Sequence, residues 1–221
     1  KEFSDDNLIT VSNTKNLFRG ITFLLTGMKV QDELDETLEQ EVSSLIRAHG
    51  GAIMEERTWK RTGIKKSFNK AVPSTILISE KEHRTVKYLI ALGSGIPCVH
   101  YNWIRNCLQA EGLVPYTDFL LPSGWSFSKN EMFYPKKDEQ PFSKAPLDDL
   151  RIELVGSPEW KESWSCIVKE AGAIAVERLY SEAEKRINVV VCETYQPHIE
   201  EKTEELGIPM LSTEWVIQCL I

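Results

Sequence analysis

The sequence predicts an α/β protein made of two tandem domains, each a mainly parallel four-stranded sheet flanked by helices. The strongest observation is an internal repeat: residues 95–108 (GIPCVHYNWIRNCL) align without a gap with residues 207–220 (GIPMLSTEWVIQCL), and six of the fourteen positions are identical. A second observation is the length of 221 residues, which suits two cores better than one. A third is that the elements upstream occur in the same order in both halves.

Those upstream elements begin with a short strand closed by a glycine, in residues 17–27 and again in residues 150–156. An amphipathic helix that ends at glycine follows, and a second strand comes after it. The third strand of each copy is a continuous apolar run, residues 74–79 (STILIS) and 187–192 (INVVVC), which is typical of buried parallel strands. Each copy closes with a helix, a strand and a helix, so the predicted order is β-α-β-β-α-β-α.

Each closing helix carries a tryptophan beside other apolar residues on one helix face. In the first copy these residues are Trp103, Ile104 and Leu108, and in the second copy they are Trp215, Val216 and Leu220. We therefore expect both tryptophans to be core residues rather than platforms for a ligand.

The chain divides into a first domain of residues 17–120 and a second domain of residues 147–221. Residues 1–16 are polar and lack the pattern of a signal peptide, so they are expected to be a linker or a remnant of cloning. Residues 121–146 have no sustained periodicity and are predicted to be the inter-repeat linker. The linker's aromatic residues indicate that it packs against the rest of the chain: Trp125, Phe127, Phe133 and Tyr134.

The charge of the chain argues against direct recognition of nucleic acid. The net charge is -7 and the pI is about 5.3, whereas a duplex-binding domain usually presents a basic face. A basic cluster exists, but a solvated loop is the more frequent explanation of such a run: Lys60, Arg61, Lys65 and Lys66. The five cysteines are scattered without a C-x-x-C pair, which indicates reduced thiols in the cytosol or nucleus. No apolar run approaches the ~18 residues of a membrane span.

The W-x-x-x-C-L pattern that closes each copy of this β-α-β-β-α-β-α repeat is similar to that of the BRCT domain. Three segments resemble the C-terminal tandem BRCT region of eukaryotic DNA-damage checkpoint mediators, above all the fission-yeast and mammalian group: residues 84–104 (RTVKYLIALGSGIPCVHYNWI), 120–127 (LLPSGWSF) and 212–221 (STEWVIQCLI). The resemblance implies a nuclear, non-enzymatic module for checkpoint signalling and DNA repair at damaged chromatin. It also implies that the ligand is a phosphoserine in a core-histone C-terminal tail, with other phosphorylated checkpoint proteins as further candidates.

A phosphate site needs donors that converge on three anionic oxygens, preferably a hydroxyl, a backbone N–H and a cation. Thr26 and Gly27, which end the first strand, offer a hydroxyl and a backbone that a ligand can approach closely. Lys87 offers the charge. In the BRCT tandems that this chain resembles, the residues that match Thr26, Gly27 and Lys87 bind the phosphate. The resemblance also implies that Arg84 grips the peptide backbone or a terminal carboxylate about three residues beyond the phosphoserine, with Thr85 helping to orient it.

The helix that carries Lys87 is predicted to span residues 82–92. Ser79 begins an S-x-x-E capping box, and Gly93 is well placed to end the helix. On such a helix Arg84 and Lys87 lie one turn apart, on a face directed away from the core and near the positive end of the helix dipole.

The second copy lacks these groups. In the gapless alignment, the position of Arg84 is taken by Gln196, and that of Lys87 is taken by Ile199. The first strand there ends in valine and glycine, so the hydroxyl is also missing, and the later helix adds four glutamates. We therefore expect a single phosphate pocket, in the first repeat, with the second repeat as its structural support.

Other readings remain open. A Thr-Gly pair alone is usually only a turn, and a helix Lys-Arg pair alone is usually solvated, so it is their joint match that favours a phosphate site. An alternative function is a scaffold that binds folded partners, or forms a homodimer, through the linker and the repeat surfaces. An enzyme ranks third, because residues 93–98 (GSGIPC) follow a helix and lack the third glycine of a dinucleotide loop. The four histidines lack metal-ligand spacing, and neither a metal nor a cofactor is predicted.

Overall fold

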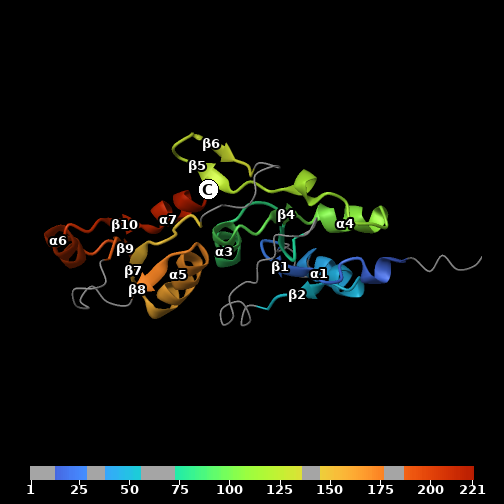
Figure 1. Ribbon diagram of the computed structural model, residues 1–221, viewed down its shortest axis with the longest axis horizontal. Helices are drawn as coiled ribbons and strands as arrows, with labels where there is room; N and C mark the ends of the chain where they lie inside the picture. Colours follow the sequence, from blue (N-terminus) through green and yellow to red (C-terminus); the bar gives the residue numbers. More distant parts are fainter. Residues whose placement is uncertain (1–12, 29–37, 56–72, 136–144, 177–186) are drawn as a thin grey trace, which may run out of the picture.

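The computed structural model describes residues 13–28, 38–55, 73–135, 145–176 and 187–221, and shows two α/β halves joined side by side (Figure 1). Each half contains a four-stranded parallel sheet, and the same element order recurs in both. The predicted fold class and the order β-α-β-β-α-β-α are therefore confirmed. None of the helices within the described residues combines the length and the apolar character needed to cross a membrane.

The first repeat forms a sheet with strand order β2-β1-β3-β4. Its elements are β1 (Thr22–Leu25), α1 (Leu38–Ala48), β2 (Ala52–Ile53), β3 (Thr75–Ser79), α3 (Val86–Ser94), β4 (Cys98–His100) and α4 (Asn102–Gln109), with short 3-10 helices η1 (Asn13–Asn16) before and η2 (Tyr116–Phe119) after them. All five residues of β3 are buried, as expected for a strand in the interior of a parallel sheet.

The second repeat forms a sheet with the matching order β8-β7-β9-β10. Its elements are β7 (Arg151–Val155), α5 (Pro158–Glu170), β8 (Ile174–Val176), β9 (Val189–Cys192), α6 (Pro197–Glu205), β10 (Met210–Ser212) and α7 (Thr213–Leu220). Ser157 begins α5 by accepting a hydrogen bond from the backbone N–H of Trp160, and Pro158 follows at a position where its missing N–H costs nothing.

Strand register extends the sequence alignment to the first strands, where the sequence alone shows no constant offset. Cys98 pairs with Leu77, and the matching Met210 pairs with Val190. Following the register one strand further places Thr26 opposite Val155 and Gly27 opposite Gly156. The structure thus supports the predicted comparison between the two strand ends.

The tryptophans of the two closing helices differ in burial. Trp103 is fully buried, its ring lies near those of Phe18 and Phe23 with centroids 6.0 and 6.4 Å away, and its indole N–H donates to the carbonyl of Val114 at 2.9 Å. Trp215 is only partly buried and packs at the edge of the core. The prediction of a core role is therefore confirmed fully for the first tryptophan and partly for the second.

Helix α3 joins the two repeats. Tyr88 and every residue after it in α3 are buried, and their cluster includes residues of α5, β7 and α7 in the second repeat. Gly93 faces Ala171 so closely that a β-carbon on the glycine would lie 3.0 Å from that of the alanine. The hydroxyl of Ser94 donates to Glu170 at 2.9 Å. The helix predicted to carry the phosphate-binding lysine is thus also the main contact between the domains, as Figure 1 shows.

The linker contains an antiparallel hairpin, β5 (Gly124–Ser126) and β6 (Glu131–Phe133), that lies beside α7. It is attached through its backbone, since Gln218 of α7 bonds to the carbonyl of Trp125 and to the N–H of Phe127, both at 2.9 Å. Three aromatic side chains of the linker remain largely exposed: Trp125 is 41% exposed, and Phe127 and Tyr134 are each 59% exposed. The linker therefore packs as predicted, but of the four aromatic side chains on which the prediction rested only Phe133 is half-buried.

Candidate phosphate-binding site

Thr26 and Gly27 follow β1 at the carboxyl edge of the first sheet. The backbone N–H of Thr26 continues the ladder to Ile78 at 3.2 Å, and the Thr26 side chain is buried. Gly27 has a φ of 68°, a left-handed conformation that favours glycine. The chain therefore turns sharply out of the sheet directly after the threonine hydroxyl.

Helix α3 begins later than predicted. Thr85 is its N-cap, with its hydroxyl accepting a hydrogen bond from the N–H of Tyr88 at 3.3 Å. Ser79 ends β3 and its hydroxyl donates to the carbonyl of Lys81, so the predicted capping box is wrong. Gly93 does not end the helix either; Gly95 does so, with a φ of 69°. Gly93 is a glycine because the second repeat packs against it.

The hydroxyls of Thr26 and Thr85 lie 3.0 Å apart. Two hydroxyls carry two protons, and their mutual hydrogen bond uses one of them. Among the described residues no acceptor is assigned to the other proton, so it is available to a ligand, whichever threonine donates in the pair. Thr85 thus contacts Thr26 while capping α3. The sequence predicts that Thr85 orients Arg84, whereas the structure pairs its hydroxyl with Thr26 and pairs Arg84 with Glu214.

Lys87 lies in the first turn of α3, and its side chain is half-buried. Its ammonium donates to the carbonyl of Leu25 at 2.9 Å, next to Thr26. An ammonium has three protons, and within the described ranges this bond uses one of them, which leaves two for another acceptor. The positive end of the α3 dipole points to the same place, since Thr85 and Lys87 belong to the helix start. A hydroxyl, a cation and a helix start therefore meet at the end of β1.

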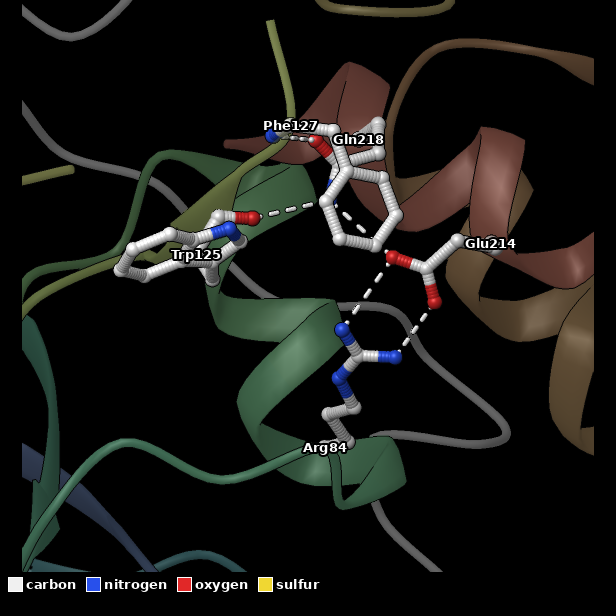
Figure 2. A network of polar contacts seen from close by, with 5 residues as sticks. All are labelled: Arg84, Trp125, Phe127, Glu214 and Gln218. Atoms are coloured by element: carbon white, nitrogen blue, oxygen red, sulfur yellow. Dashed lines mark hydrogen bonds and ion pairs between the residues drawn. The ribbon is translucent and has the colours of Figure 1, made fainter. Parts of the chain in front are cut away.

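Arg84 lies before the helix rather than within it, and its guanidinium faces the second repeat (Figure 2). It donates two hydrogen bonds to the carboxylate of Glu214 on α7, of which the bond from Nη2 to Oε1 is 3.1 Å long. The same Oε1 accepts a bond from Gln218 at 3.0 Å. Arg84 and Lys87 therefore do not share one face; they lie at the repeat boundary and beside the strand end, respectively.

Three neighbours of the site were not predicted from the sequence: Glu214, Gln218 and His83. Glu214 and Gln218 lie in the second repeat and reach Arg84 only because the repeats pack together. His83 precedes Arg84 in the chain, and its ring Nε2 is 3.2 Å from the carbonyl oxygen of Gly27. The sequence signal that could have identified His83 was its position next to Arg84 and Thr85, two predicted site residues.

Other chemistry finds no support in the described part of the chain. No group of three or more potential metal ligands is gathered there. Burial raises the pKa of the Cys98 thiol to about 12 and raises those of Cys107 and Cys219, so these thiols are poor nucleophiles at neutral pH. The basic cluster of residues 60–66 lies outside the described residues.

Comparisons with known proteins identify both repeats. Two family models, both described as the BRCA1 C Terminus (BRCT) domain, match residues 13–108 and residues 145–221. The chain is 26% identical to the DNA repair protein crb2 of Schizosaccharomyces pombe, over 99% of this chain and 32% of that protein. It is also 26% identical to Mediator of DNA damage checkpoint protein 1 of Rattus norvegicus, over 64% of this chain and 11% of that protein.

Among solved structures, the BRCT5-BRCT6 domains of S. pombe Brc1 have a TM-score of 0.50 with 15% sequence identity, over 91% of this chain and 92% of that one. At this identity the likeness establishes the fold alone. The chain spans about a third or less of the length of the two curated relatives.

Proposed function

The chain belongs to the BRCT family, as two such domains in tandem, and on this premise we propose that its first repeat binds phosphoserine peptides. BRCT tandems of checkpoint mediators are protein-interaction modules and not enzymes. The expected ligand is a phosphorylated core-histone C-terminal tail, and other phosphorylated checkpoint proteins are further candidates. Such a module would work in the nucleus, where it would retain a longer protein at damaged chromatin.

The observation that carries the proposal is the convergence of Thr26, Thr85 and Lys87 at the start of α3. Counting only bonds within the part of the chain that the structure describes, the pair of hydroxyls retains one free proton and the ammonium retains two, beside the glycine turn. Charge-assisted hydrogen bonds to phosphate oxygens are roughly twice as strong as bonds between neutral groups. The arrangement therefore suits a dianionic phosphate better than a neutral ligand.

The second repeat offers a contrast within the same molecule. Val155 takes the place of Thr26, and Ile199 takes the place of Lys87, so neither the hydroxyl nor the cation is present. Helix α6 is strongly acidic, with glutamates at 200, 201, 204 and 205. This asymmetry supports one phosphate per tandem, in the first repeat.

Arg84 supports a direction for the peptide. A guanidinium has five donors, and the pair with Glu214 uses two of them on one side of the fork. The remaining donors suit a peptide carbonyl or a terminal carboxylate. We therefore propose that the peptide runs from the phosphate at Thr26, Gly27 and Lys87 toward the boundary between the repeats.

Calorimetry with a phosphoserine peptide and its unmodified twin tests the proposal. The phosphopeptide is expected to bind, and Lys87→Met is expected to cost about 1.5–3 kcal/mol, or one to two decades in affinity. Lys161→Met, an exposed lysine on α5, is the matched control and should leave the affinity unchanged. Equal affinities for the two peptides, or a Lys87→Met protein that binds like wild type, would refute the proposal.

A second candidate function is a scaffold that binds folded partners or self-associates. The exposed rings of Trp125, Phe127 and Tyr134 on the linker hairpin favour it. Sedimentation velocity at several concentrations tests the self-association. A monomer throughout the range would contradict it, whereas a mass that rises with concentration in wild type but not in Phe127→Ser would support it.

A further inference from the structure

His83 covers Gly27. A β-carbon placed on Gly27 would lie 2.1 Å from Cδ2 and 2.2 Å from Nε2 of the imidazole, far inside van der Waals contact. Gly27 therefore has two reasons to be glycine: its left-handed φ and the ring that lies against it. Neither reason depends on a ligand.

The ring also binds the backbone of Gly27. Nε2 is 3.2 Å from the carbonyl oxygen, which can only accept, so Nε2 carries the proton and donates it. This bond directs the carbonyl dipole of Gly27 to His83. A carbonyl oxygen that faced a bound phosphate would repel it. Because the imidazole holds the Gly27 carbonyl oxygen by a hydrogen bond, this repulsion is reduced and an anion can bind next to the turn.

The N–H of Gly27 is left for a ligand. Within the described part of the chain the structure assigns it no acceptor, while the preceding N–H of Thr26 is bonded to Ile78. A backbone N–H beside the hydroxyl of Thr26 is the third kind of donor that a phosphate site requires.

At the equivalent turn of the second repeat, an acidic side chain takes the place of the imidazole. There Gly156 is covered by Trp160 and Glu193: an added β-carbon would lie 2.7 Å from Cε3 of Trp160 and 2.8 Å from both Cβ and Oε2 of Glu193. The Glu193 carboxylate accepts the N–H of Ser157, the residue after Gly156, at 2.7 Å, so an internal anion already lies against this turn. An imidazole that occupies the carbonyl in one repeat, and a carboxylate that occupies an N–H in the other, match the predicted difference in phosphate binding.

We propose that His83 is a positioning residue of the phosphate site, which fixes the turn at Gly27 by donating to its carbonyl and so presents the Gly27 N–H to the phosphate. This inference rests on the proposed function for the identity of the ligand. The hydrogen bond between His83 and Gly27 does not depend on the proposed function, because it exists without any peptide.

Two variants separate the hydrogen bond from the packing. His83→Phe keeps a ring over Gly27 but has no donor, and we expect phosphopeptide affinity to fall about fivefold, the effect of one hydrogen bond. His83→Gln restores an N–H donor and should bind within about twofold of wild type. The Gly27 amide resonance in ¹H–¹⁵N spectra of the free proteins should move in His83→Phe and return toward wild type in His83→Gln. Thermal melting of each variant shows whether it is folded.

The outcomes separate the two proposals. If wild type does not prefer the phosphopeptide, the proposed function fails, while the amide resonance still reports whether His83 fixes the turn. If wild type prefers the phosphopeptide but His83→Phe binds it equally well, the positioning role is wrong. An affinity of His83→Gln as low as that of His83→Phe would overturn it too, because restoring the donor would then have no effect.

Discussion

Arg84 of the first repeat and Glu214 of the second form a two-pronged ion pair across the domain boundary, 130 residues apart in the chain. Glu214 is also bonded to Gln218, which anchors the linker hairpin through the backbone of Trp125 and Phe127 (Figure 2). One carboxylate therefore connects the predicted peptide-binding arginine to the linker. The side chains are 56% and 31% exposed, so solvent screens the pair and its contribution to stability is small.

Glu214→Gln should weaken phosphopeptide binding with little effect on folding. The glutamine removes the charge that orients Arg84, and we expect an affinity loss of about three- to tenfold and a change of less than ~1 kcal/mol in unfolding free energy. Calorimetry and urea denaturation measure the two effects. Glu205→Gln, an exposed glutamate on α6, is the charge-matched control. A rise in affinity would contradict the prediction, because it would mean that Glu214 competes with the ligand for Arg84.

Gly93→Leu should separate the repeats. A leucine side chain would start 3.0 Å from the β-carbon of Ala171 and meet the α5 backbone, so α3 and α5 would have to move apart. Overpacking of this kind typically costs about 1–3 kcal/mol. We expect a lower melting temperature and faster proteolysis between the domains.

Gly112→Ala is the control for Gly93→Leu, because a β-carbon on Gly112 meets only one atom, at the ordinary distance of 3.7 Å. If Gly93→Leu melts like Gly112→Ala, the close contact between α3 and α5 does not exist in solution.

The sequence predicted what depends on short-range periodicity. The order of the elements and the position of Thr26 and Gly27 at a strand end follow from apolar patterns and glycines. The start of α3 does not follow from such patterns: Ser79 was predicted to cap the helix, whereas Thr85 caps it in the structure. Ser79 is fully buried at the end of β3 and bonds within its own loop, which leaves Thr85 to cap the helix.

Tertiary contacts account for the remaining differences. Arg84 was predicted beside Lys87 because the two lie three residues apart, but its partner is Glu214, whose position depends on how the repeats pack. Gly93 was predicted to end the helix because a glycine after an apolar run usually does. Its actual role is to allow the close contact with Ala171 at the end of α5, which no local sequence pattern shows. The binding roles of Thr26, Gly27, Arg84, Thr85 and Lys87 remain predictions.

The two closing tryptophans should differ in their effect on stability. Trp103 is fully buried among aromatic rings and donates a hydrogen bond, so Trp103→Ala should cost about 3–5 kcal/mol. Trp215 occupies the equivalent position but is partly exposed, so Trp215→Ala should cost less. Urea denaturation monitored by circular dichroism measures both. Equal losses would contradict the difference in burial that the structure shows.

The stability of the first repeat should fall in mild acid because of His100. Desolvation lowers the pKa of His100 below its ordinary value of 6.5, although Glu80 acts in the opposite direction. Nδ1 of His100 accepts the N–H of Asn102 at 3.1 Å. The unfolded chain takes up a proton as the pH falls through about 6.5, while the folded chain resists it, so unfolding becomes easier below that pH. Urea denaturation at pH 7.5 and 5.5 should show a loss in wild type and a smaller loss in His100→Asn, which keeps an acceptor but cannot titrate. His198→Asn, an exposed histidine on α6, should behave like wild type. An identical pH dependence in His100→Asn and wild type would exclude His100 as the titrating group.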